Sequence, residues 1–101
     1  MKSFIYRLED DAINDFVESF DFYEDRQMGL GVRFKDEVKE NLEIIQRHPL
    51  SFSILFRNAR KKSLDKFPFQ IIYTVDEDKY EIAVIAIWHS RRNPDLLKSR
   101  I

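Results

Sequence analysis

The side chains best suited to chemistry in this 101-residue chain are basic, and they form two groups. The first group lies between positions 57 and 66, and the second begins at a histidine that two arginines follow closely. Guanidinium and ammonium groups that share a surface bind phosphates or a carboxylate-rich partner. The candidate target- or phosphate-binding residues are therefore Arg57, Arg60, Lys61, Lys66, His89, Arg91 and Arg92.

Both groups would border one concave surface if the strands that carry them pair. The alternative is a solvated sheet edge, because lysine and arginine commonly protect edge strands against aggregation. On charge alone the solvated edge is the more common case.

His89 is the one histidine near these basic groups, since His48 falls at a predicted helix end. Neighbouring arginines would lower the pKa of the imidazole, and the neutral ring could then act as a general base. The alternative is a structural role in a turn. Taken alone, a histidine without a paired carboxylate more often has that structural role.

Other sites are not supported by the sequence. There is no cysteine, no Gly-rich phosphate loop and no spacing typical of metal ligands, so we expect neither a metal nor a cofactor. The aromatic residues could stack on bases, but aromatic side chains that alternate along strands more often pack in a core. They are Phe67, Phe69, Tyr73 and Trp88.

Length and composition predict one domain over residues 1–101, with 44% hydrophobic residues to form its core. The start of the chain, from Met1 to Arg7, soon becomes charged and lacks the apolar stretch of a signal peptide. No segment approaches transmembrane length. We therefore expect a soluble cytoplasmic protein without membrane association.

The hydrophobic pattern of the first half predicts a strand and two helices. Apolar residues alternate from Phe4 to Leu8, which is typical of a strand. From Asp11 they recur every three or four residues, which indicates an amphipathic helix that Asp10 or Asp11 caps. The apolar positions of this helix are Ala12, Ile13, Phe16, Val17, Phe20 and Tyr23. Gly29-Leu30-Gly31 separates it from a second helix, which contains Phe34, Val38, Leu42 and Ile45 and ends before Pro49.

The second half predicts three strands and a helical tail. Residues 54–57 and 62–64 form one strand that the polar stretch 58–61 interrupts, while 69–75 and 80–88 form a hairpin. The last strand is apolar nearly throughout, so we place it centrally, buried on both faces. Asn93-Pro94 begins a short helix. The predicted fold class is α+β, with an N-terminal strand, an antiparallel helical hairpin packed on a small antiparallel sheet, and a short C-terminal helix.

The net charge of −1 conceals an uneven distribution along the chain. Residues 1–28 carry a net charge of −5, residues 29–56 are neutral, and residues 57–101 carry +4. A basic C-terminal third can present a patch that binds anions although the whole chain is nearly neutral.

Two segments, Lys66 to Tyr73 and His89 to Pro94, resemble the RelE/ParE superfamily of bacterial toxins. Gly31-Val32-Arg33-Phe34 at the start of the second helix and Pro49 after its end are similar to the ParE-like branch, as is Ala12 in the first helix. The resemblance covers essentially the whole chain. It implies the toxin of a type II toxin-antitoxin module, a plasmid stabilisation system, neutralised by a cognate antitoxin that wraps the toxin in a hetero-oligomer.

The resemblance implies one of two targets. RelE-like members are ribosome-dependent mRNA endonucleases that use basic residues and often a tyrosine near the C-terminus, whereas ParE members poison DNA gyrase and lack that set. Residues 95–101 contain neither tyrosine nor histidine, which favours a non-enzymatic gyrase inhibitor. In the alternative, an mRNA interferase, His89 and Arg91 are the candidate catalytic residues and the other basic residues hold the phosphate. A third possibility is an inactive homologue that only binds its partner.

Overall fold

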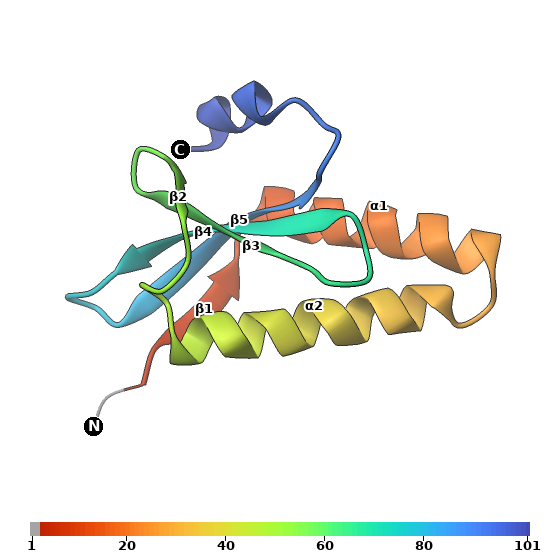
Figure 1. Cartoon of the computed structure of the whole chain (residues 1–101), viewed down its shortest axis with the longest axis horizontal. Coiled ribbons are helices and arrows are strands. Elements are labelled where there is room, and N and C mark those ends of the chain that lie inside the picture. The colour runs from red at the N-terminus through yellow and green to blue at the C-terminus, as the bar shows by residue number, and fades with distance from the viewer. Residues whose placement is uncertain (1–2) are drawn as a thin grey trace.

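The computed structural model describes residues 3–101, so the part of the signal-peptide prediction that concerns Met1 and Lys2 lies outside the described residues. It has a five-stranded sheet with a long helical hairpin against one face and a short helix near the C-terminus against the other (Figure 1). The elements are β1 Ile5–Leu8, α1 Asp10–Arg26, α2 Leu30–Arg47, β2 Ile54–Phe56, β3 Ala59–Ser63, β4 Phe69–Asp76, β5 Glu81–His89 and the 3₁₀ helix η1 Pro94–Arg100.

Helix α1 follows the predicted period, with two corrections. Its N-cap is Glu9, which makes no side-chain capping bond, so the predicted cap at Asp10 or Asp11 is wrong. Both aspartates lie inside the first turn, where their charges favour the positive end of the helix dipole. Ile13 and Val17, expected on the packing face, are 45% and 48% exposed, because the sheet and α2 cover a narrower stripe of α1.

The reversal between the helices depends on two glycines and one carboxylate. Gly29 has a φ of +88°, a left-handed conformation that glycine adopts without strain. Gly31 lies where the helices meet, and a Cβ there would be 2.8 Å from the carbonyl oxygen of Phe20. The Glu24 carboxylate accepts hydrogen bonds from the N–H groups of Gly29 and Gly31, at 2.8 and 2.9 Å. The predicted break is confirmed at Gly29, whereas Leu30 and Gly31 already belong to α2.

The sheet has the strand order β1-β5-β4-β3-β2. The four later strands pair antiparallel, as predicted, whereas β1 pairs parallel with β5 from Ile5 opposite Glu81 to Leu8 opposite Val84. Strand β5 therefore has a neighbour on both sides over its first half, and its residues from Val84 to Trp88 are all buried. The predicted central position of this apolar strand is confirmed.

The prediction of one interrupted strand between residues 54 and 64 is wrong. Residues 59–61 of the polar stretch belong to β3, which pairs with both β2 and β4, and the chain turns at Arg57 and Asn58. The φ of Arg57 is +50°. Apolar alternation did not reveal β3, because its central residues are Arg60, Lys61 and Lys62. The Arg60 side chain donates to the main-chain oxygen of Phe52 at 2.8 Å, and only Ala59 of this strand is buried in an apolar cluster.

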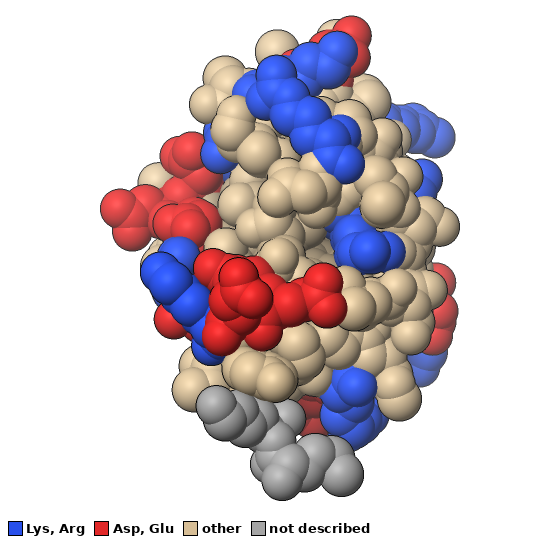
Figure 2. Space-filling model, turned by 90° about the vertical axis from the view of Figure 1, so that its left-hand side faces the viewer, with Lys and Arg blue, Asp and Glu red and all other residues tan. Residues whose placement is uncertain are grey.

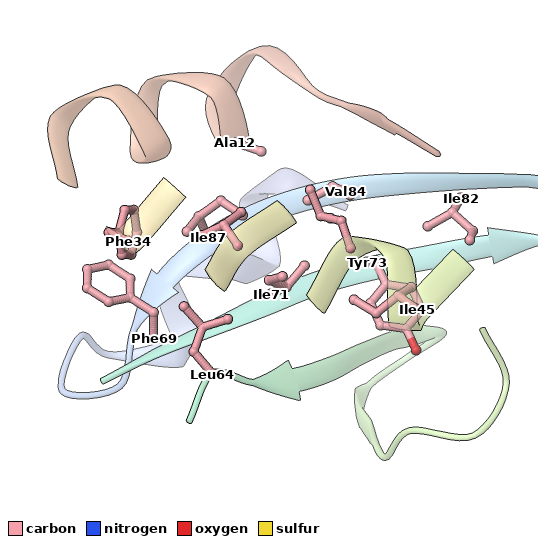
Figure 3. Packing of buried hydrophobic residues seen from close by; sticks show 12 residues of the cluster. Ala12, Phe34, Ile45, Leu64, Phe69, Ile71, Tyr73, Ile82, Val84 and Ile87 are labelled. Carbon is pink, nitrogen blue, oxygen red and sulfur yellow. The ribbon is translucent and has the colours of Figure 1, made fainter. Parts of the chain in front are cut away.

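Two apolar clusters lie on opposite faces of the sheet. The larger one fills the space between the hairpin and the sheet, where Phe34 and Ile45 of α2 meet Ile71, Tyr73 and Ile87 of the strands, as Figure 3 shows. The second lies under η1 and contains Ala59, Ile72, Ile85, Ala86, Trp88 and Leu97. Within residues 3–101, no helix is long and apolar enough to cross a membrane.

Candidate functional site

The segment from His89 to Arg92 leaves the end of β5 and turns directly into η1. Asn93 begins this helix as predicted: its side-chain oxygen accepts a hydrogen bond from the N–H of Asp95 at 3.0 Å, and Pro94 occupies the first position. The turn is closed by the N–H of Arg92, which donates to the His89 carbonyl oxygen at 3.0 Å. The candidate residues of the second basic group therefore lie on a short, firmly anchored connection.

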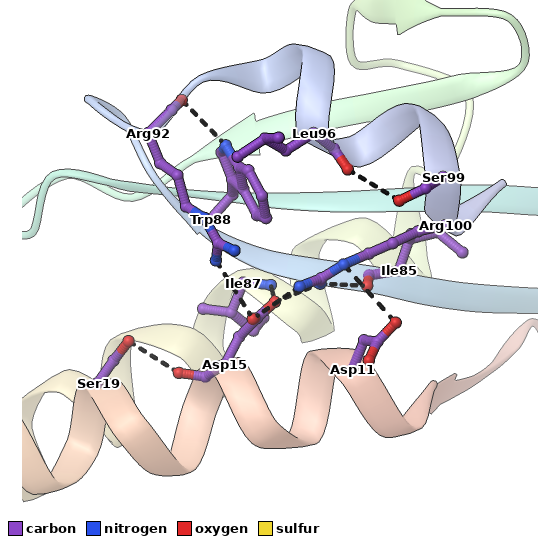
Figure 4. A network of polar contacts seen from close by, with 10 residues as sticks. All are labelled: Asp11, Asp15, Ser19, Ile85, Ile87, Trp88, Arg92, Leu96, Ser99 and Arg100. Carbon is purple, nitrogen blue, oxygen red and sulfur yellow. Dashed lines mark hydrogen bonds and ion pairs between the residues drawn. The ribbon is translucent and has the colours of Figure 1, made fainter.

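Arg92 is held between an aromatic ring and a carboxylate. Its guanidinium carbon lies 3.9 Å from the centre of the Trp88 ring, and its Nη1 lies 3.8 Å from Oδ1 of Asp15 (Figure 4). The indole N–H of Trp88 in turn donates to the main-chain oxygen of Arg92 at 3.1 Å. A guanidinium stacked on an indole keeps N–H groups available at its edge. Arg92 is thus half-exposed yet fixed in direction.

Asp15 also binds Arg100, and this pair is far better shielded from water. Nη1 of Arg100 lies 2.6 Å from Oδ2 of Asp15 and Nη2 lies 3.1 Å from Oδ1, with 14% and 8% of the two side chains exposed. Arg100 lies in addition 3.7 Å from the carboxylate of Asp11. The hydrogen bonds that the Arg100 guanidinium donates to Asp15 raise the pKa of Arg100 above its ordinary value.

The side chains of Asp15 and Arg100 also form hydrogen bonds with main-chain groups along the unpaired edge of β5. Strand β1 pairs with β5 only as far as Val84, so the next main-chain groups have no strand beside them. The Ile87 N–H donates to Oδ2 of Asp15 at 3.1 Å, and Arg100 donates to the Ile85 carbonyl oxygen at 3.2 Å. Figure 4 shows the pair between α1 and η1, beside β5. Buried main-chain groups need such partners.

Sequence reasoning missed this role of Asp15, and it included Arg100 only in the net charge of residues 57–101. The sequence did contain a signal that Asp15 is buried. Asp15 lies three residues after Ala12 and directly before Phe16, within the apolar stripe of α1, where a carboxylate requires a buried partner. Finding that partner requires the tertiary structure, because 85 positions separate the two residues.

His89 packs on the side of the sheet that faces the helical hairpin. Its ring meets the Phe69 ring edge-on, with 5.0 Å between the centres. Its Nδ1 accepts a hydrogen bond from the N–H of Arg91 at 3.1 Å. The other ring nitrogen, Nε2, takes no part in this bond. The Arg91 side chain is exposed to solvent.

The first basic group lies elsewhere. The assumed pairing of its strand with the last strand is not found, because β4 separates β3 from β5. Arg57 donates to the main-chain oxygen of Ile101 at 2.9 Å. Ile101 follows the C-terminal end of η1, whereas Arg92 precedes its N-terminal end. Arg60 is bound to loop carbonyl oxygens, and the N–H of Lys66 donates to the carboxylate of Glu37 on α2 at 3.1 Å. Lys61 lies on β3, opposite Ile72 of β4.

The distribution of charge over the surface does not simply follow the acidic first third and the basic last third of the sequence. Figure 2 shows acidic side chains gathered on one side of the molecule, with basic side chains above them in the direction of η1. The β4–β5 connection, which belongs to the basic C-terminal third, bears Asp76, Glu77 and Asp78, and these line one pocket together with Arg7 and Lys79. In residues 3–101 no group of three or more histidine and acidic side chains is arranged to hold a metal ion.

Several known proteins share this architecture. The ParDE toxin-antitoxin system encoded on the chromosome of P. aeruginosa superposes with a TM-score of 0.71 at 16% identity, covering 85% of this chain and 95% of that one. An arginine double mutant of the E. coli toxin RelE in the free state gives 0.70 at 14% identity, covering 98% and 94%. The intact E. coli RelBE toxin-antitoxin complex gives 0.63 at 17% identity, covering 88% and 99%. At these identities the similarity shows a shared fold.

Sequence comparison gives the family directly. No curated protein sequence matches the chain significantly. The family model described as the ParE toxin of the type II toxin-antitoxin system parDE matches residues 6–94, which include the helical hairpin, the sheet and the turn from His89 to Arg92. The chain therefore belongs to the ParE toxin family of type II toxin-antitoxin systems within the RelE/ParE superfamily.

Proposed function

We propose that this protein inhibits DNA gyrase by binding it, without catalysing a reaction, and that a cognate antitoxin neutralises it in a hetero-oligomer. Membership of the ParE toxin family supports the gyrase target. The antitoxin partner is supported by the similarity to a ParDE system and to a RelBE complex. The proposal implies a cytoplasmic protein, because gyrase acts on chromosomal DNA in the cytoplasm.

The dispersal of the basic residues is the observation that favours binding over RNA cleavage. A nuclease needs several cationic groups around one phosphate, together with groups that move a proton. Here Arg57 and Arg60 donate to main-chain oxygens, and Arg100 is engaged by a buried aspartate. Lys66 lies in the connection between β3 and β4, where its main-chain N–H donates to Glu37 of α2. Of the candidate residues, only His89, Arg91 and Arg92 gather at one place.

These three residues form the proposed contact with the target. Arg91 is exposed, and Arg92 is oriented by Trp88 and Asp15, so both can bind carboxylates or phosphates on gyrase. A cation that is already fixed in direction loses less conformational entropy on binding than a free one. His89 holds the turn through its bond to the Arg91 N–H.

The RelE-like alternative, a ribosome-dependent mRNA endonuclease, is favoured by a different observation. His89 lies beside two arginines and has one ring nitrogen not engaged by Arg91, which is the arrangement of a proton-transfer group next to a phosphate clamp. In this alternative His89 and Arg91 are catalytic.

One pair of assays separates the two functions. Purified toxin is incubated with gyrase and relaxed plasmid, and in parallel with ribosomes that are translating a defined mRNA. Loss of supercoiling with intact mRNA is the expected result. Cleaved mRNA with unaffected gyrase would establish the alternative, and activity in neither assay would indicate a homologue that only binds its partner.

A further inference from the structure

Two arginines lie beside one buried carboxylate next to β5. Asp15 is within ion-pair distance of both Arg92 and Arg100, and Figure 4 shows both guanidinium groups directed at it. The two contacts are unequal. Arg100 makes two hydrogen bonds, of 2.6 and 3.1 Å, whereas Nη1 of Arg92 stays 3.8 Å away, beyond hydrogen-bond distance. The carboxylate is therefore bound by Arg100 and only approached by Arg92.

Solvent exposure separates the two arginines in the same way. The Arg100 side chain is nearly buried and has a second carboxylate, that of Asp11, at 3.7 Å, so its charge is balanced within the fold. The Arg92 side chain is 48% exposed, and within residues 3–101 its one carboxylate partner is Asp15. A half-exposed guanidinium that is not hydrogen-bonded to a carboxylate keeps its donors available to an anionic group of another molecule.

The shared carboxylate makes the state of Arg92 depend on Arg100. A buried carboxylate that loses its cation remains unfavourable until another cation replaces it. Arg92 already lies next to Asp15, and an approach of about 1 Å would bring the two within hydrogen-bond distance. The Trp88 ring allows this approach, because it lies beside both guanidinium groups, 3.9 Å from Arg92 and 5.1 Å from Arg100. Arg92 would then be neutralised inside the molecule.

We propose that Arg100 is a positioning residue for the basic turn, residues 89–92: by occupying Asp15, it keeps the Arg92 guanidinium free to bind an anionic group of the target. Arg100 does not contact the target itself, because it is nearly buried. The inference deepens the proposed function, since it rests on Arg92 as a target contact. The state of Arg92 is a property of the toxin chain alone, so it can be measured without gyrase.

One double variant distinguishes this role from a merely structural one. Arg100→Gln leaves Asp15 buried and charged, so a weaker toxin is expected in either case. Adding Asp15→Asn removes the charge that would capture Arg92. If Arg100 acts through Arg92, the double variant recovers activity. If Arg100 only holds η1 in place, the double variant has lost the same ion pair and is no more active than Arg100→Gln.

The first measurement uses the toxin alone and follows the reaction of each arginine with phenylglyoxal by tandem mass spectrometry. A guanidinium bound to a buried carboxylate is shielded from this reagent. We expect the rate at Arg92 to fall roughly threefold to tenfold in Arg100→Gln, and to return to within about twofold of the wild-type rate when Asp15→Asn is added. The exposed Arg91 is the internal control and should react equally in all three proteins. An unchanged rate at Arg92 in Arg100→Gln would overturn the proposal.

The second measurement is the toxin concentration that halves supercoiling by gyrase. Arg100→Gln should raise it about tenfold, and the double variant should return it to within about threefold of the wild type. A double variant as weak as Arg100→Gln would show a purely structural role for Arg100. If the reactivity of Arg92 changes as expected while wild-type toxin leaves gyrase unaffected, the proposed function is wrong and the control of Arg92 by Arg100 stands.

Thermal unfolding identifies a temperature at which each variant is folded. If Arg100→Gln does not fold, Arg100→Lys takes its place, because a lysine keeps the charge but lacks the fork that gives Arg100 two bonds to Asp15. It should lower the Arg92 rate about twofold, and adding Asp15→Asn should reverse the change. Lys98→Ala, exposed on the same helix, is the matched control and should equal the wild type in both measurements. A rate at Arg92 that Arg100→Lys leaves unchanged would contradict the proposal.

Discussion

Asp15 on α1 and Arg100 on η1 form a two-pronged ion pair that takes the place of a strand beside the second half of β5. The pair connects three features of the molecule: the first helix, the open edge of the last strand and the end of the chain. Since Asp15 also lies 3.8 Å from Arg92, the structural pair and the proposed target-binding residue share one carboxylate. Under the proposed function, Asp15 therefore couples the stability of the fold to the target contact.

Removing Arg100 should destabilise the fold strongly. In Arg100→Ala the Asp15 carboxylate stays buried and loses its main partner, so we expect the free energy of unfolding to fall by about 3 kcal/mol. Lys98→Ala is the matched control: its ion pair with Asp95 is exposed, and the change should stay within about 0.5 kcal/mol. Urea titrations measure both. Equal effects of the two substitutions would show that the buried pair adds no stability.

Gly31→Ala should force the two helices apart. The added Cβ would lie 2.8 Å from the Phe20 carbonyl oxygen, which belongs to the main chain and has little freedom to shift. Overpacking of this kind costs roughly 1–3 kcal/mol. Val32→Ala, at an exposed neighbouring position, is the control and should change the unfolding free energy by less than about 0.5 kcal/mol. A Gly31→Ala protein as stable as the wild type would mean that the hairpin adapts freely.

Tyr73 makes the fold sensitive to alkali. Burial raises the pKa of its phenol to about 12, against about 10 in the unfolded chain. Above pH 10 the unfolded state loses the proton and the folded state keeps it, so the free energy of unfolding should fall by roughly 2–3 kcal/mol as the pH rises from 10 to 12. Below pH 10 the phenol contributes no pH dependence.

Tyr73→Phe isolates this effect in unfolding titrations at several alkaline pH values. The variant should lose about 1 kcal/mol at neutral pH, because the hydroxyl donates to the Pro49 carbonyl oxygen at 2.8 Å, and should then show a much shallower alkaline fall. Burial also raises the pKa of Tyr23, so some fall remains. An unchanged alkaline slope in the variant would assign the effect to other groups.

The two arginines of the basic turn should differ when replaced. Arg91 is exposed, so Arg91→Ala should leave stability within about 0.5 kcal/mol of the wild type while reducing growth arrest on expression. Arg92→Ala should reduce growth arrest as well, but should also cost about 1 kcal/mol through the lost stacking on Trp88. Toxicity that survives both substitutions would place the target contact elsewhere on the molecule.

The helices and the central hairpin could be predicted from the sequence because their apolar residues repeat at helical or strand spacing. Phe34, Val38 and Ile45 follow the period of α2, and the apolar run from Ile82 to Ile87 indicates a buried strand. Strand β3 could not be found in this way, because Arg60 is held by carbonyl oxygens and not by apolar packing.

The candidate site was predictable only in part. The segment from His89 to Arg92 is continuous in the sequence, so its residues are necessarily close together in space. Whether the first basic group joins them depends on strand order, and β4 lies between β3 and β5. The pairing of Asp15 with Arg100 and the parallel arrangement of β1 are contacts between distant segments, which local patterns do not specify.

Gyrase inhibition by purified toxin is the most direct test of the proposed function. Wild-type toxin, Arg91→Ala and the exposed control Lys39→Ala are compared in a supercoiling assay, with a translating ribosome and mRNA reaction beside it. We predict that the wild type and Lys39→Ala abolish supercoiling, that Arg91→Ala is markedly weaker, and that the mRNA stays intact in all three. Unaffected supercoiling together with ribosome-dependent cleavage of the mRNA would contradict the account.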